Sequence, residues 1–138
     1  MFDHCLYFNT TALARVLERE WSRAFKPFGL TPPQAFMLRA ILVKPGMLQS
    51  ELARELVVTR PTATRGLDGL QALGLVERRA TGGDARESAI YPTEAGLALH
   101  GALDAASGEV TRRMKQSLGD DAFGGMVIQL KKARSAAG

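Results

Sequence analysis

The sequence predicts a mainly α-helical fold that carries one small β-hairpin. Apolar residues recur every three or four positions over long stretches, which places them on one face of a helix. Two short extended runs, "LVERRA" and "ESAIYPT", flank the polar turn "TGGD", an arrangement typical of a hairpin. With 138 residues, 46% of them hydrophobic, the chain is expected to form a single domain, 1–138.

Two helices are expected at the start of the chain. The first covers residues Phe2 to Phe28, and Pro27 and Gly29 end it. The second lies in "LTPPQAFMLRAILV", where Thr31 is a good N-cap and Pro32 fits the first turn. The "KPG" that follows stops this helix.

Two further helices follow with almost no gap between them. The first is the short amphipathic "LQSELARELVV", and the second lies in "TRPTATRGLDGLQALGLV". Thr59 caps the second helix, Pro61 fits its first turn, and Gly74 ends it. Its buried side is marked by a leucine stripe of Leu67, Leu70 and Leu73. Two helices joined by a tight turn and followed by a hairpin predict a winged helix-turn-helix.

The hairpin leads into two C-terminal helices. A long helix is expected from Thr93 and ends at Gly119. Asp120 can cap a final helix, although Gly124 and Gly125 weaken its helical propensity.

The expected layout is a winged lobe at 30–96 flanked by helical segments at 1–28 and 97–138. These flanking helices carry more apolar stripe than a small monomer needs, which is the pattern of an obligate dimer. They are therefore interpreted as dimerisation helices. The alternative is that the stripes fold back onto the lobe of the same chain.

The charge distribution favours an anionic partner. The formal net charge is +4, and every basic residue from Arg54 to Arg86 is an arginine. Arginine makes forked contacts to phosphates and guanines. The single cysteine, Cys5, allows no intramolecular disulfide, which favours the reducing cytoplasm. The N-terminus does not resemble a signal peptide and no apolar run reaches membrane-span length, so no membrane association is expected.

The first turn of the second helix in the pair is the candidate reading element. In a helix-turn-helix this end meets base edges in the major groove. Threonine hydroxyls and arginine guanidiniums can bond bases or phosphates, while small Pro61 and Ala63 can approach thymine methyls. The candidate residues are Thr59, Arg60, Pro61, Thr62, Ala63, Thr64 and Arg65. The alternative is an ordinary amphipathic helix with a solvated polar end.

The hairpin supplies a second candidate element. Arg78 and Arg79 lie on the strand that enters the turn, where they can reach backbone phosphates. Arg86 follows the tip, and Asp84 can fix its direction for a narrow minor groove. The alternative for Asp84 and Arg86 is a surface salt bridge of little consequence.

The stretch from "QSELARELVV" to "YPTEAG" resembles the DNA-binding core of the MarR family, the multiple-antibiotic-resistance-type bacterial repressors. In chain order the matching motifs are Glu51-Leu52-Ala53, Thr59-Arg60-Pro61-Thr62, Leu67 with Leu70, Gly74-Leu75-Val76, Asp84-x-Arg86 and Thr93-Glu94-x-x-Gly96. Two departures are Leu48, where the family usually has a capping Ser or Thr, and Pro92, where Leu is common.

The resemblance implies a homodimer with intertwined terminal helices and two winged lobes that read a pseudo-palindromic operator. It makes Thr59 to Arg65 the reading end, Arg86 the wing-tip arginine and Asp84 its orienting partner. The expected function is a DNA-binding transcription regulator, most often a repressor in this family.

The resemblance also implies two routes by which DNA is released. Hydroperoxide-sensing members use a cysteine near the start of the first helix, and Cys5 stands there beside His4 and Tyr7. The alternative for Cys5 is inert packing. The second route is a small aromatic or amphipathic effector bound between the dimer helices and the lobe. Its pocket could use Trp21, Phe25, Phe28, Phe36 and Met37, although aromatic residues at helical spacing usually form core.

Enzyme classes find no support in the sequence. Two histidines and one cysteine make no evident metal set, and Gly82-Gly83 lacks the context of a phosphate-binding loop. No cofactor or metal is expected. The alternative to DNA binding is a winged-helix module that binds protein, because a fold does not fix function.

Overall fold

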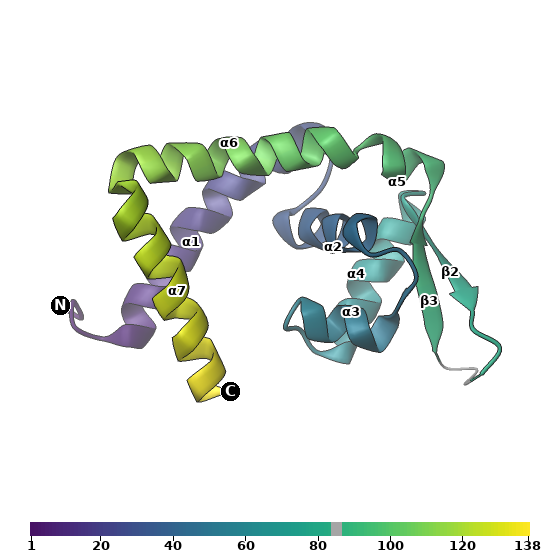
Figure 1. Cartoon of the computed structure of the whole chain (residues 1–138), viewed down its shortest axis with the longest axis horizontal. Coiled ribbons are helices and arrows are strands. Elements are labelled where there is room, and N and C mark those ends of the chain that lie inside the picture. Colours follow the sequence, from purple (N-terminus) through teal and green to yellow (C-terminus); the bar gives the residue numbers. More distant parts are fainter. Residues whose placement is uncertain (84–86) are drawn as a thin grey trace.

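The structure is a computed structural model that describes residues 1–83 and 87–138 (Figure 1). The helices are α1 (Leu6–Phe25), the 3-10 turn η1 (Lys26–Phe28), α2 (Pro32–Val43), α3 (Gln49–Glu55), α4 (Arg60–Ala72), α5 (Glu94–Ala98), α6 (His100–Leu118) and α7 (Asp120–Ala137). The strands are β1 (Met47–Leu48), β2 (Val76–Ala80) and β3 (Ser88–Pro92). The predicted fold class, helices with a small β wing, is confirmed.

The winged lobe consists of α2, α3, α4 and a three-stranded antiparallel sheet in the order β1-β3-β2. Strand β3 pairs with β2 from Val76↔Pro92 to Ala80↔Ser88, and β1 pairs with β3 on its other edge. The lobe encloses a core of fully buried side chains that includes Leu38, Ile41, Leu52, Leu67, Leu70 and Ile90. This core holds the outward faces of α4 and the hairpin in fixed positions.

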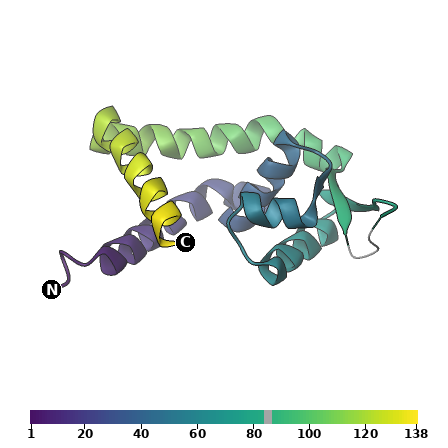
Figure 2. The same ribbon diagram turned by 60° about the horizontal axis from the view of Figure 1, so that its bottom comes forward.

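Helices α1, α6 and α7 extend away from the lobe. Figures 1 and 2 show α6 running from the wing side of the lobe to the opposite end of the molecule, where α7 turns back. Helix α1 packs against α6, and its C-terminal Phe25 is fully buried in the lobe core. We call α1, α6 and α7 the stem.

A polar junction joins the stem to the lobe. The buried Ser107 hydroxyl of α6 accepts hydrogen bonds from Trp21 Nε1 of α1 (3.2 Å) and Arg39 Nη1 of α2 (3.1 Å). Arg39 Nε also donates to Asp104 Oδ1 of α6 at 2.9 Å. Since a buried hydroxyl needs partners, this junction fixes three helices relative to one another.

Some predicted boundaries differ in the structure. Helix α1 begins at Leu6 rather than Phe2 and gives way to η1 at Lys26, because Pro27 removes a backbone donor. The long helix predicted from Thr93 is two helices, interrupted at Leu99, whose N–H bonds to the Gly96 carbonyl three residues earlier. Strand β1 was not predicted, because two residues carry no periodicity.

The two departures from the family pattern leave the local structure intact. Leu48 precedes α3 without a side-chain cap, and Glu51 Oε1 instead accepts a hydrogen bond from the Leu48 N–H at 3.0 Å. Pro92 ends β3, after which Thr93 caps α5. None of the helices described in 1–83 and 87–138 has the length and apolar character needed to cross a membrane.

Candidate nucleic-acid interface

Helix α4 begins with a side-chain cap. Thr59 has extended backbone angles, and its Oγ1 accepts a hydrogen bond from the Thr62 N–H at 3.3 Å. Just before it, Val57 adopts a positive φ of 57° in the turn from α3 to α4. A β-branched residue in this region costs about 1–2 kcal/mol, so the surrounding structure must hold the turn. The Val58 N–H does so in part by donating to the Ala53 carbonyl at 3.0 Å.

One side of α4 is locked into the lobe core and the other is exposed. Ala63, Leu67 and Leu70 are each 0% exposed. The sequence interpretation of Ala63 as a contact to thymine methyls is therefore wrong, because Ala63 lies in the i, i+4, i+7 stripe with those leucines. The exposed residues of the predicted reading end are Thr59, Arg60, Pro61, Thr62 and Arg65.

Thr64 lies at the edge of this surface and is bonded within the protein. Its Oγ1 donates to the Arg60 carbonyl at 3.0 Å and accepts from Gln49 Nε2 of α3 at 2.7 Å. Arg65 Nη2 donates to Thr62 Oγ1 at 3.3 Å, one turn earlier on the outer face. Thr62 and Arg65 thus form an exposed polar pair that can meet a ligand, whereas Thr64 mainly ties α3 to α4.

The structure reassigns Arg78 from phosphate contact to a brace between the wing and α4. Its side chain is only 22% exposed and lies 2.8 Å from Asp68. It also donates to Gln71 Oε1 at 2.6 Å and to the Thr64 carbonyl at 3.4 Å. Since these acceptors occupy the guanidinium, the phosphate role predicted for Arg78 is not supported. The brace instead fixes the hairpin against the second and third turns of α4.

Arg79 lies on the opposite face of the hairpin, because successive strand residues alternate in direction. Its guanidinium carbon lies 3.9 Å from the centroid of the Tyr91 ring, and Nε donates to Glu77 Oε1 at 2.9 Å. The side chain is more than half exposed. Arg79 therefore remains accessible to a phosphate. The predicted tip residues Asp84 and Arg86 lie outside the described residues.

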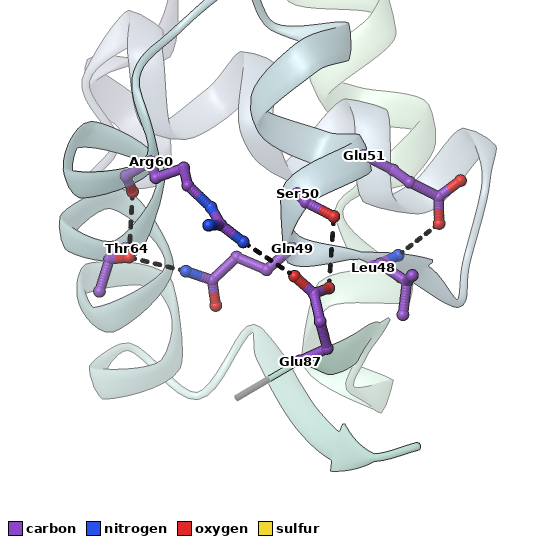
Figure 3. A network of polar contacts seen from close by, with 7 residues as sticks. All are labelled: Leu48, Gln49, Ser50, Glu51, Arg60, Thr64 and Glu87. Atoms are coloured by element: carbon purple, nitrogen blue, oxygen red, sulfur yellow. Dashed lines mark hydrogen bonds and ion pairs between the residues drawn. The ribbon is translucent and has the colours of Figure 1, made fainter. Parts of the chain in front are cut away.

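A polar cluster that the sequence did not reveal lies between the wing and the start of α4 (Figure 3). Glu87, the residue before β3, accepts hydrogen bonds from Ser50 Oγ of α3 (3.3 Å) and from Arg60 Nη2 of α4 (3.2 Å). Gln49 and Thr64 lie beside this pair. We call Gln49, Ser50, Arg60, Thr64 and Glu87 the wing-base cluster. These residues lie far apart in the sequence, on α3, on α4 and just before β3, so no local sequence pattern could have indicated the cluster.

The described ranges contain no group of three or more His, Cys, Asp or Glu side chains placed to hold a metal ion. Cys5 is exposed and caps α1, where its Sγ accepts a hydrogen bond from the Phe8 N–H at 3.5 Å. Cys5 is therefore not buried within the single chain. Of the residues considered for an effector pocket, Phe25 and Met37 are buried in the lobe core.

The capped helix α4, the tight turn from α3 and the braced hairpin define a winged helix-turn-helix protein. The MarR family profile matches residues 28–87, which include α2, α3, α4 and β2. The winged lobe of this chain is therefore similar to the MarR family, which is a family of transcription regulators rather than enzymes.

Two curated relatives support this assignment. The uncharacterised HTH-type transcriptional regulator YybA of Bacillus subtilis is 30% identical over 88 residues, covering 64% of this chain and 59% of YybA. The HTH-type transcriptional repressor Rv2887 of Mycobacterium tuberculosis is 37% identical over 84 residues, covering 61% of this chain and 60% of Rv2887. The matched region thus spans about 60% of these relatives.

Solved structures extend the likeness to the stem. The M. tuberculosis transcriptional regulator MosR has 29% sequence identity and a TM-score of 0.81, with 99% of each chain covered. The Staphylococcus aureus MepR–DNA complex has 20% identity and a TM-score of 0.86, covering 97% of this chain and 99% of MepR. At that identity MepR shows the fold alone.

Proposed function

We propose that this chain is a sequence-specific, double-stranded DNA-binding transcription regulator that acts as a homodimer in the cytoplasm. The observation that carries the proposal is the outer face of α4. Arg60, Thr62 and Arg65 are exposed there, while Ala63 and Leu67 anchor the same turns in the core. A rigid helix that presents arginine and hydroxyl donors suits the major groove.

Dimerisation is proposed from the apolar surface of the stem. No residue of α7 is buried in the single chain, and Ile128 is 55% exposed. The exposed apolar side chains of the stem include Leu6, Tyr7, Val16, Met126, Val127, Ile128 and Leu130. Since exposed apolar surface of this kind marks an interface, we propose that a second copy of this chain packs against the stem. Two lobes related by a two-fold axis would read a pseudo-palindromic operator.

The experiment that tests this function starts with a random-sequence duplex library. The wild-type protein selects its preferred duplex, and its affinity is then measured for that duplex and for a scrambled one at two salt concentrations. DNA binding predicts a clear preference for the selected duplex and a steep loss of affinity with salt, because phosphate contacts release counterions. Equal binding of both duplexes would remove sequence-specific reading and favour the protein-interaction alternative.

The wing is proposed to contribute Arg79 and the tip arginine Arg86, with Asp84 as the orienting partner of Arg86. The support for the tip is the Asp84-x-Arg86 motif in the sequence. Arg86→Ala is expected to weaken binding to the selected duplex while leaving the dimer and the helix content unchanged. Retained affinity in this variant would remove the wing assignment.

Regulation is proposed to be repression, relieved by a small aromatic or amphipathic ligand. The support is an open apolar groove of about 460 Å³ between α1 and α2, lined by Leu17, Trp21, Pro32 and Phe36 among others. Benzoate is a suitable first probe, and a shift in operator affinity with benzoate would support this route.

Oxidation of the exposed Cys5 is the second route. It predicts that a hydroperoxide releases DNA from the wild type and not from Cys5→Ser.

A further inference from the structure

Glu87 has two polar partners from two different helices. Its Oε2 accepts from the Ser50 hydroxyl of α3 at 3.3 Å, and its Oε1 accepts from Arg60 Nη2 of α4 at 3.2 Å. The Glu87 side chain is only 19% exposed, whereas that of Arg60 is 76% exposed. The Glu87 carboxylate is therefore mostly covered, just before β3, and the Arg60 side chain extends from α4 to meet it (Figure 3).

Arg60 is restrained at its backbone as well as at its tip. The Thr64 hydroxyl bonds to the Arg60 carbonyl, and Gln49 Nε2 bonds to the same hydroxyl. A guanidinium has five N–H donors, and Glu87 occupies one of them here. Among the residues that the structure describes, no further acceptor is bonded to this guanidinium, so its remaining donors stay available on an exposed side chain whose direction the carboxylate sets.

The position of Glu87 is unfavourable for simple phosphate binding. A carboxylate beside the reading end of α4 repels a polyanion, and an ion pair with one exposed partner contributes little to stability. An unpaired arginine at this position would bind any phosphate, which carries no sequence information. An arginine whose direction is fixed can instead make two hydrogen bonds to O6 and N7 of a guanine.

We propose that Glu87 is a specificity-determining positioning residue that directs Arg60 onto a guanine edge and away from the phosphate backbone. The inference rests on the proposed function, and it names the base class that this part of the site reads. Glu87 acts through Arg60 and touches no base itself.

The test compares Glu87→Gln, Arg60→Ala and the double variant. Glutamine keeps the side-chain size and an oxygen that can accept from Ser50. Affinities are measured for the selected and scrambled duplexes over a salt series. Glu87→Gln is expected to bind the scrambled duplex several-fold more tightly, with a steeper salt dependence, and its preference for the selected duplex should fall about fivefold or more. In the Arg60→Ala background the same change should leave the preference unaltered.

A base-level probe completes the test. Each guanine of the selected duplex is replaced in turn by 7-deazaguanine, which lacks N7. One guanine should be found whose replacement weakens the wild type and leaves Arg60→Ala unaffected. Glu109→Gln on α6 is the matched control and should change neither affinity nor preference.

Two results would overturn the proposal. One is an equal change of both affinities in Glu87→Gln, and the other is a loss of preference that persists without Arg60. A wild type that did not distinguish the two duplexes would instead overturn the proposed function, and this inference with it. Circular dichroism of each variant shows whether the fold is retained.

Discussion

The guanidinium of Arg78 in the wing lies 2.8 Å from the carboxylate of Asp68 in α4. This pair joins the hairpin to the middle of α4, where the Asp68 side chain is 61% exposed and that of Arg78 is 22% exposed. Arg60 and Glu87 join the same two elements at the start of α4, 3.2 Å apart. The wing and α4 are thus linked at two levels, so the two surfaces proposed to contact DNA keep a fixed relation.

Removal of the Arg78 brace should destabilise the lobe. Arg78→Ala is expected to lower the free energy of unfolding by about 1–2 kcal/mol, because hydrogen bonds to Asp68, Gln71 and Thr64 are lost on a mostly covered side chain. Arg79→Ala is the control, and its loss should stay within about 1 kcal/mol because its ion pair is exposed. Urea unfolding measures both, and equal losses would contradict the brace.

Gly96 should tolerate no side chain. A Cβ at this position would lie 2.2 Å from the Leu75 carbonyl oxygen, which is backbone and cannot move aside. Gly96→Ala should therefore cost at least about 2 kcal/mol in thermal or urea unfolding.

Gly66→Ala is the matched comparison for Gly96→Ala. Its added Cβ would meet the terminal methyl of Met37 at 2.7 Å, the flexible end of a long side chain. Alanine also favours the helix by about 1 kcal/mol, so this variant should stay within about 1 kcal/mol of the wild type. A greater loss of unfolding free energy in Gly66→Ala than in Gly96→Ala would contradict this packing argument.

The turn between α3 and α4 should gain stability from a residue suited to positive φ. Val57 is 61% exposed, so Val57→Asn loses little packing and relieves backbone strain. We expect a gain of about 0.5–1 kcal/mol in unfolding free energy, part of the strain of about 1–2 kcal/mol. Val43→Asn, at an exposed end of α2, should give no gain. A loss of stability in Val57→Asn would show that the valine side chain has a role that its exposure does not reveal.

A charged residue on the apolar face of the stem should disrupt the proposed dimer. Ile128→Asp on α7 is expected to shift the protein from dimer to monomer in light scattering, since an unpaired carboxylate is costly in an apolar interface. Binding of the selected duplex should weaken with it, because two linked lobes bind more tightly than one. Gln129→Asp is the control. An unchanged dimer in Ile128→Asp would place the interface elsewhere.

The parts of the fold that depend on local pattern were predictable from the sequence. The caps at Thr31, Thr59 and Thr93 and the two runs around "TGGD" specify their own elements. The burial of Ala63 was also open to prediction, because it continues the stripe of Leu67 and Leu70. The sequence interpretation instead followed the polar residues around Ala63 in the first turn of α4, and it therefore places Ala63 on the wrong face of the helix.

Contacts between elements far apart in the chain were not predictable in this way. Glu87 is 27 residues from Arg60 and 37 from Ser50, and these pairs form only when the sheet places the wing beside α3 and α4. The contacts of Arg78 with α4 were not predictable for the same reason, because they also depend on how the sheet is placed against the helix. Two adjacent arginines on a strand look equivalent in the sequence, but the pleat turns Arg78 toward α4 and Arg79 toward Tyr91.

The central claim is that the outer face of α4 reads DNA. Its most direct test is the affinity of Arg65→Ala for the selected duplex, compared with Arg112→Ala, an exposed arginine on α6. Both variants lose one positive charge, so net charge cannot explain a difference between them. We expect Arg65→Ala to weaken binding by about 10- to 100-fold and Arg112→Ala to leave it nearly unchanged. Equal affinities of the two variants would contradict the assignment of α4 as the reading helix.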